Sequence, residues 1–156
     1  MKKIVYLCCF LGACNAQVPN DSTPTTPAPQ YAYQVVGGKS GAPVELLNID
    51  CKSKLITLSR HTQAKTLIYQ HQSPIESSQC SEAAVLAASL CKAAEQQQSD
   101  VFDAAGYQLT CSDKNGDTVI FKWQGTLRDS PEGLRPWHDY TRKLVDSSFP
   151  GKNVYP

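Results

Sequence analysis

The sequence has no long apolar run, no excess of charge of either sign and no common zinc or serine-hydrolase motif. The apolar stretch from Ile4 to Phe10 is far shorter than the ~20 residues that a membrane-spanning helix needs. Lys and Arg number 15 against 14 Asp and Glu, without a basic stripe, so we expect no nucleic-acid partner. No Cys-x-x-Cys pair and no Gly-x-Ser-x-Gly turn is present. The patterns typical of zinc ribbons and of the hydrolase nucleophile elbow are therefore missing.

The N-terminus combines basic residues, an apolar run and a cysteine. Lys2 and Lys3 precede the apolar run, which is the order found in secretory signals. Leu11-Gly12-Ala13-Cys14 then resembles the lipobox of bacterial lipoprotein precursors, in which Leu stands three residues before the Cys and small residues lie between them. The resemblance implies that residues 1–13 are a lipoprotein signal peptide. It also implies that the Cys14 thiol is lipidated and that the new amino terminus is acylated, for example by palmitate.

Two alternatives for this segment are an ordinary secretory signal cleaved after Ala16 and a buried N-terminal strand. The first leaves the spacing of Cys14 to coincidence, and the second does not explain the paired lysines. In enteric lipoproteins an Asp after the lipidated Cys usually retains the protein in the inner membrane, whereas this chain has Asn15. The resemblance therefore implies an outer-membrane lipoprotein with its domain in the periplasm or at the cell surface.

Composition divides the mature chain into three parts. Residues 14–43 are rich in proline and poor in core-forming residues, so we expect a tether, of which residues 18–29 alone could reach roughly 35 Å. Residues 31–36 alternate weakly and suit either one more strand or more linker. Residues 44–149 are expected to form one globular domain, followed by a tail at 150–156. Without Lys2 and Lys3, 13 basic residues face 14 acidic ones, a net charge of −1.

Alternating apolar residues predict a three-stranded meander. Leu47 and Ile49 alternate with polar neighbours, and so do Ile56 and Leu58. A tight turn between the two segments pairs Ile49 with Ile56 and Leu47 with Leu58, so both apolar sets share one face. A second turn at the "TQAK" segment sets Leu58 opposite Tyr69. The result is a meander with one wet side.

A hairpin and two helices complete the expected fold. The "DKNG" turn suits a three-residue hairpin loop, which predicts three pairs: Tyr107 with Trp123, Leu109 with Phe121, and Cys111 with Val119. An Ala-rich segment predicts a helix with a stripe made of Ala83, Leu86, Ala87, Leu90 and Ala94. A second helix ends at Pro150, and its helical spacing joins Trp137, Tyr140, Leu144 and Ser148. The expected class is α+β: a small antiparallel sheet, made of the meander and the hairpin, packed on two helices.

Four cysteines besides Cys14 remain in the mature chain: Cys51, Cys80, Cys91 and Cys111. An even number in an oxidising compartment predicts two disulfides, for which three connectivities exist. Cys80 with Cys91 is excluded, because eleven residues along one helix separate their Cα atoms by ~16 Å. We favour Cys51–Cys80 and Cys91–Cys111 over the crossed alternative and over a zinc site.

Catalytic signals are weak. His138 and Asp139 are adjacent, but helical neighbours point ~100° apart and do not form a dyad. His71 and Asp50 are a second candidate pair across the first strands. Neither pair amounts to a catalytic site, so we expect no catalytic residue, no metal site and no cofactor.

Two functions of different class remain open. The first is a non-enzymatic binding or assembly module, such as an accessory subunit of an envelope or secretion complex or a hydrolase inhibitor, with a protein partner in the envelope. Its expected partner-binding residues are Phe149, Val154 and Tyr155, which follow a helix stop, although they could equally pack on their own domain. The second is a small envelope hydrolase that uses His71 or His138.

Overall fold

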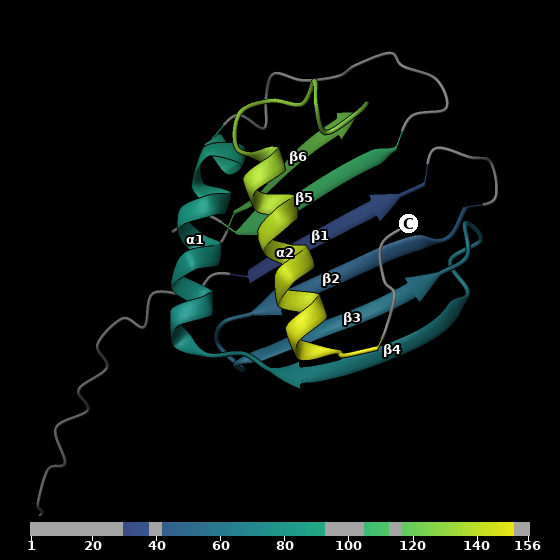
Figure 1. Ribbon diagram of the computed structural model, residues 1–156, viewed down its shortest axis with the longest axis vertical. Helices are drawn as coiled ribbons and strands as arrows, with labels where there is room; N and C mark the ends of the chain where they lie inside the picture. The colour runs from purple at the N-terminus through teal and green to yellow at the C-terminus, as the bar shows by residue number, and fades with distance from the viewer. Residues whose placement is uncertain (1–29, 38–41, 93–104, 113–116, 152–156) are drawn as a thin grey trace, which may run out of the picture.

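The computed structural model describes residues 30–37, 42–92, 105–112 and 117–151 (Figure 1). The expected signal peptide at residues 1–13, Cys14, the "DKNG" segment, Val154 and Tyr155 lie outside these ranges. The domain is α+β, with a six-stranded antiparallel sheet, two helices and two disulfides. The elements in chain order are β1 (Gln30–Val36), β2 (Val44–Asp50), β3 (Leu55–His61), β4 (Leu67–Pro74), α1 (Ser77–Lys92), β5 (Gly106–Ser112), β6 (Thr118–Gln124) and α2 (Leu134–Ser148).

The strand order is β4-β3-β2-β1-β5-β6, which places β1 inside the sheet. β1 pairs with β2 on one side and with β5 on the other, and both pairings are antiparallel. Residues 30–36, which were expected to belong to the tether, therefore form a strand of the sheet. The alternation of Tyr31, Tyr33 and Val35 was the correct signal, because these three side chains are buried.

Pairing of β2 with β3 and of β5 with β6 follows the expected registers. Ile49 lies opposite Ile56, and Leu109 lies opposite Phe121. The register of β3 with β4 was wrong by two residues, since Leu58 lies opposite His71 and not Tyr69. A wider turn and a shift in pairing after Arg60 account for the difference.

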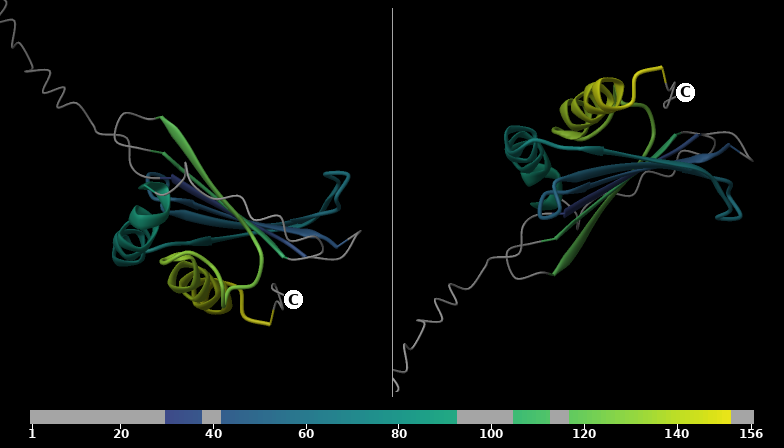
Figure 2. Two further views of the ribbon diagram at one scale, coloured as in Figure 1. Left: turned by 90° about the horizontal axis from the view of Figure 1, so that it is seen from above. Right: turned by 90° about the horizontal axis from the view of Figure 1, so that it is seen from below.

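Both helices cover one face of the sheet, and no helix in the described part of the chain lies on the other face (Figure 2). The core lies between the two layers. From α1 it takes Ala83, Ala87 and Leu90 of the predicted stripe, whereas Leu86 is only partly buried and Ala94 lies outside the described residues. From α2 it takes Trp137, Tyr140 and Leu144, which have the predicted spacing. Ser148, the fourth residue of that spacing, is only partly buried.

The two disulfides join α1 to the sheet and have the favoured connectivity. Cys51 follows β2 and bonds to Cys80 near the start of α1, with Cα atoms 5.8 Å apart. Cys91 near the end of α1 bonds to Cys111 of β5, with Cα atoms 6.4 Å apart. α1 is therefore fixed covalently to the sheet near both of its ends.

Candidate functional site

His138 lies in the core and is only 9% exposed. Its Nδ1 is 2.9 Å from the hydroxyl of Tyr33, and the ring of Tyr107 packs edge-on against it. Burial lowers the pKa of His138, while the nearby Asp139 carboxylate opposes that effect. A buried, hydrogen-bonded imidazole in an aromatic setting is a structural group that holds α2 on the sheet.

His71 and Asp50 do not come together. His71 faces the helices, where its ring stacks on Tyr69 with centroids 5.3 Å apart and lies near Phe149. Asp50 belongs to the alternate set of β2 positions and therefore faces the opposite side of the sheet. Its Oδ1 accepts the backbone N–H groups of Lys52 and Ser53. The sheet thus separates the two members of this candidate pair.

A buried ion pair was not expected from the sequence. Glu45 is 3% exposed, and its Oε1 lies 2.8 Å from Nε of Arg60 on the neighbouring strand. The hydroxyl of Tyr69 donates a hydrogen bond to Oε2 of Glu45. Burial raises the pKa of Glu45, and the guanidinium and the hydroxyl oppose that effect. The cross-strand pairing of Glu45 with Arg60 in the predicted register was the signal that could have identified the pair.

Phe149, the described member of the expected C-terminal binding residues, is not exposed. Phe149 is 7% exposed and belongs to the hydrophobic core, where it contacts the His71 ring. Its backbone N–H caps the end of α2 by donating to the carbonyl of Val145. Phe149 therefore packs on its own domain, as the alternative interpretation held. Val154 and Tyr155 lie outside the described residues.

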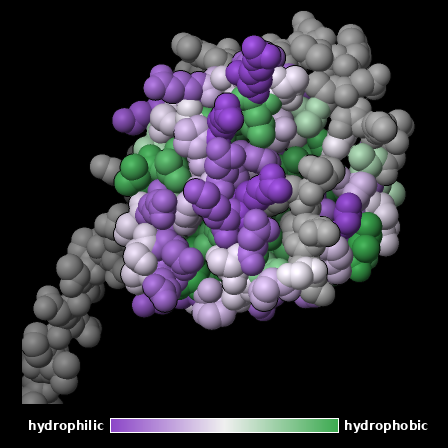
Figure 3. Space-filling model, in the orientation of Figure 1, coloured by the Kyte–Doolittle hydropathy of each residue, from purple (hydrophilic) through white to green (hydrophobic). Residues whose placement is uncertain are grey.

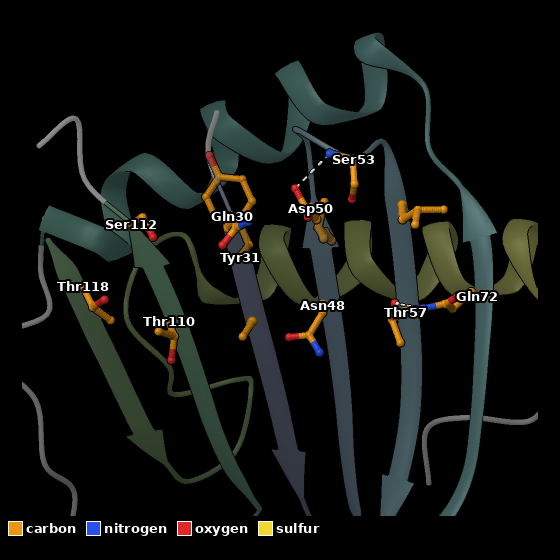
Figure 4. A pocket seen from close by; sticks show the side chains of 13 residues that line it. Gln30, Tyr31, Asn48, Asp50, Ser53, Thr57, Gln72, Thr110, Ser112 and Thr118 are labelled. Carbon is orange, nitrogen blue, oxygen red and sulfur yellow. Dashed lines mark hydrogen bonds between the residues drawn. The ribbon is translucent and has the colours of Figure 1, made fainter. Parts of the chain in front are cut away.

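The two faces of the domain differ in what they present. The outer side of the helix layer is mostly hydrophilic over α2 (Figure 3). The sheet face without helices, hereafter the open face, contains a hollow of about 480 Å³, within the size range of ligand-binding clefts. Figure 4 shows polar side chains from several strands around it. The amides are Gln30, Asn48 and Gln72, and the hydroxyls include Thr57, Thr110, Ser112 and Thr118.

The lining of the hollow is nearly neutral. Among the described residues that line it, none is basic and Asp50 is the single acid. A hydrogen bond from the Ser53 side chain, together with backbone N–H groups, lowers the pKa of Asp50. This set of residues was not predictable from the sequence, because alternating Asn, Gln and Thr in a strand is also typical of any solvated sheet face. Only the strand order brings these residues to one place.

Comparisons with known proteins supply no relative. The chain matches no protein-family model, and no curated protein matches it significantly. Neither helix in the described part of the chain is long and apolar enough to cross a membrane. Within the same ranges, no group of three His, Cys, Asp or Glu side chains is placed to hold a metal ion.

Proposed function

We propose that this protein is a lipid-anchored lipoprotein of the bacterial outer membrane whose domain is a non-enzymatic binding module. The N-terminal part of the proposal rests on Lys2, Lys3 and the lipobox-like sequence that ends at Cys14. Because the sheet begins at Gln30, residues 14–29 are left as the tether. At ~3 Å per extended residue they would allow up to about 50 Å between lipid and domain.

The observation that carries the binding function is the hollow on the open face. Two helices close the other face over the core, whereas this face leaves a concave surface of about 480 Å³ with converging polar side chains. The two histidines of the hydrolase alternative belong to the opposite side, where His138 bonds to Tyr33 and His71 stacks on Tyr69. The open face is therefore the surface that this domain offers to a partner.

The proposal can be tested with a photocrosslinking amino acid placed in living cells. Gln108 of β5 alternates with buried Tyr107 and Leu109 and so belongs to the open face. Val85 of α1 is 75% exposed on the helix layer and is the matched control. We expect adducts from position 108 and none from position 85. Adducts confined to position 85, or absent from both, would contradict the proposal.

The identity of the adduct separates the possible partners. A protein adduct would fit the partner expected from the sequence, an accessory complex or a hydrolase in the envelope. An adduct that glycan-degrading enzymes convert to a smaller species would indicate a saccharide. Both outcomes keep the binding module, and they differ only in what it binds.

A further inference from the structure

The depth of the hollow comes from a small residue between larger polar ones. Ala32, in the middle of the sheet, lies opposite Asn48 on one side and opposite Thr110 on the other. Its methyl group is smaller than the side chains of Asn48 and Thr110, which line the hollow beside it (Figure 4). The hollow thus has a small apolar floor, and its walls are polar except for the side chain of Leu55, which is 37% exposed.

Polar groups continue across the strands in one line. Asn48 lies opposite Thr57, and Thr57 lies opposite Gln72 on the edge strand β4. The amide of Gln72 donates a hydrogen bond to the Thr57 hydroxyl over 3.3 Å. Adjacent strands lie ~4.8 Å apart, so hydrogen-bonding groups repeat at that interval across the sheet. A linear ligand lying across the strands would meet an amide or a hydroxyl on β4, β3, β2 and β5, and the methyl group of Ala32 on β1.

The charge of the hollow restricts the ligand. No described lining residue is basic, so a phosphate, sulfate or carboxylate would find no cation to pair with. The single carboxylate, that of Asp50, already accepts the backbone N–H groups of Lys52 and Ser53. A cationic ligand would therefore find a single carboxylate, and that carboxylate already accepts two backbone hydrogen bonds. An uncharged ligand fits better than either ion.

Amides and hydroxyls also restrict the kind of uncharged ligand. Asn and Gln each present a donor and an acceptor, and Thr and Ser hydroxyls do both. Sugar hydroxyls likewise donate and accept, so they can satisfy both kinds of group without leaving one unpaired. Extended peptides instead bind by adding a strand to a sheet edge and placing side chains in pockets. The hollow lies on the face of the sheet. Among its described lining residues, Tyr31 and Ile49 have their side chains buried in the core, so that Ala32 and Leu55 are the apolar side chains presented to a ligand.

We infer that the hollow around Ala32 binds an uncharged oligosaccharide laid across the strands, with Asn48, Thr57, Gln72 and Thr110 as its hydrogen-bonding groups. The inference rests on the proposed function in one respect, that the domain is a binding module, and it adds the class of ligand.

The test is titration of the mature full-length protein, held in a phosphocholine detergent that carries no sugar headgroup. The probes are maltotetraose and the N-acetylglucosamine tetramer, with tetragalacturonate as the charged control. Calorimetry measures affinity, and backbone amide shifts locate the site. We expect at least one neutral tetrasaccharide to bind with a dissociation constant below about 1 mM, to shift amides of β1, β2 and β3, and to bind at least tenfold more tightly than the anion.

Three variants locate the site. Ala32→Phe fills the floor of the hollow and should weaken binding at least tenfold. Gln34→Phe lies on the same strand and face but does not line the hollow, so it should bind as the parent does. Asn48→Leu keeps a similar volume and removes both hydrogen-bonding groups, and it provides a second loss-of-binding variant if Ala32→Phe does not fold.

Several results would overturn the inference. These are no binding of either neutral probe, tighter binding of the anion, or parental affinity in folded Ala32→Phe or Asn48→Leu. If position 108 nevertheless forms protein adducts in cells, the class of ligand is wrong and the binding module stands. If neither sugar binds and position 108 forms no adduct, both proposals fail.

Discussion

The hydroxyl of Tyr33 and Nδ1 of His138 lie 2.9 Å apart in the core, and they join the central strand β1 to α2. Tyr33 is 1% exposed, and its ring also packs edge-on against Trp137. The pair is therefore a polar contact in an aromatic environment, where an unsatisfied partner costs more than in water. His138 contributes to stability in a way that depends on its protonation.

The free energy of unfolding should fall as the pH drops below about 6.5, the ordinary pKa of an unfolded histidine. Burial lowers the pKa of His138 in the folded protein, so between the two values the unfolded chain binds a proton that the folded chain does not. The contribution of His138 to the free energy of unfolding is therefore complete above its pKa in the unfolded chain. It decreases as the pH falls toward the pKa of His138 in the folded protein, by up to ~1.4 kcal/mol per pH unit. Urea unfolding between pH 7.5 and 5 measures this slope.

The His138→Gln variant should have a shallower slope than the parent over that range, besides being destabilised by about 1 kcal/mol through the altered hydrogen bond. Val85→Ala is the matched control, because Val85 is 75% exposed and carries no titratable group. It should keep the parental slope. Equal slopes in the parent and in His138→Gln would show that His138 does not titrate differently in the two states.

The disulfides should each contribute about 2–4 kcal/mol, because each one restricts the unfolded chain. They close segments of 29 and 20 residues, and this difference in loop length is worth only a few tenths of a kcal/mol. We therefore expect similar losses in the Cys51→Ala/Cys80→Ala and Cys91→Ala/Cys111→Ala double variants. Val85→Ala, on the exposed side of the same helix, should stay within about 0.5 kcal/mol of the parent.

Urea unfolding of the oxidised proteins measures the difference in free energy of unfolding between each cysteine variant and the parent. Peptide mapping without reductant checks the connectivity of the disulfides. A bridge between Cys51 and Cys91 in the isolated protein would contradict the structure. So would a double variant as stable as the parent.

The sequence predicted those parts of the fold that depend on local periodicity. Ile49 with Ile56 and Leu109 with Phe121 were predictable, because short turns and alternation determine the register together. The cysteine pairing was predictable for a similar reason, since helix geometry excluded one connectivity and the expected layers favoured one of the rest. The α+β class followed from the same elements.

The remaining errors arise where distant segments decide the outcome. β1 has the alternation of a strand, but its neighbours in the sheet are β2 and β5, and nothing near Gln30 in the sequence indicates that second partner. The shift after Arg60 changes the register of β4 through a turn that alternation alone does not specify. The hollow was not predictable, because Asn48, Ala32 and Thr110 come from three strands that only the tertiary fold makes adjacent.

Replacing one member of the Glu45–Arg60 pair should destabilise the protein more than replacing both. Arg60→Met would leave the buried Glu45 carboxylate with only the Tyr69 hydroxyl as a partner. We expect this variant to lose about 3 kcal/mol of stability. This value is near the low end for buried ion pairs, because the Arg60 side chain is 31% exposed. Replacing both residues by Met removes the buried charge as well. Unfolding by urea should place the double variant within about 1 kcal/mol of the parent. A double variant less stable than the Arg60→Met variant would contradict this account.

Cys14, which lies outside the described residues, is the expected site of lipid attachment. If the lipobox-like sequence is processed, the mature protein begins at Cys14 with a lipid on its thiol, and more than one acyl chain makes membrane attachment stable where a single chain is marginal. Mass spectrometry of the protein from its own membranes should then show an N-terminal peptide that starts at Cys14 and carries acyl groups. Cys14→Ser should remove the lipid and release the protein from the membrane fraction, while Cys51 and Cys80 still form their bridge. An unmodified N-terminal peptide that begins at Gln17 would instead identify an ordinary secretory signal, and the tethered arrangement would be wrong while the open-face hollow could still be tested.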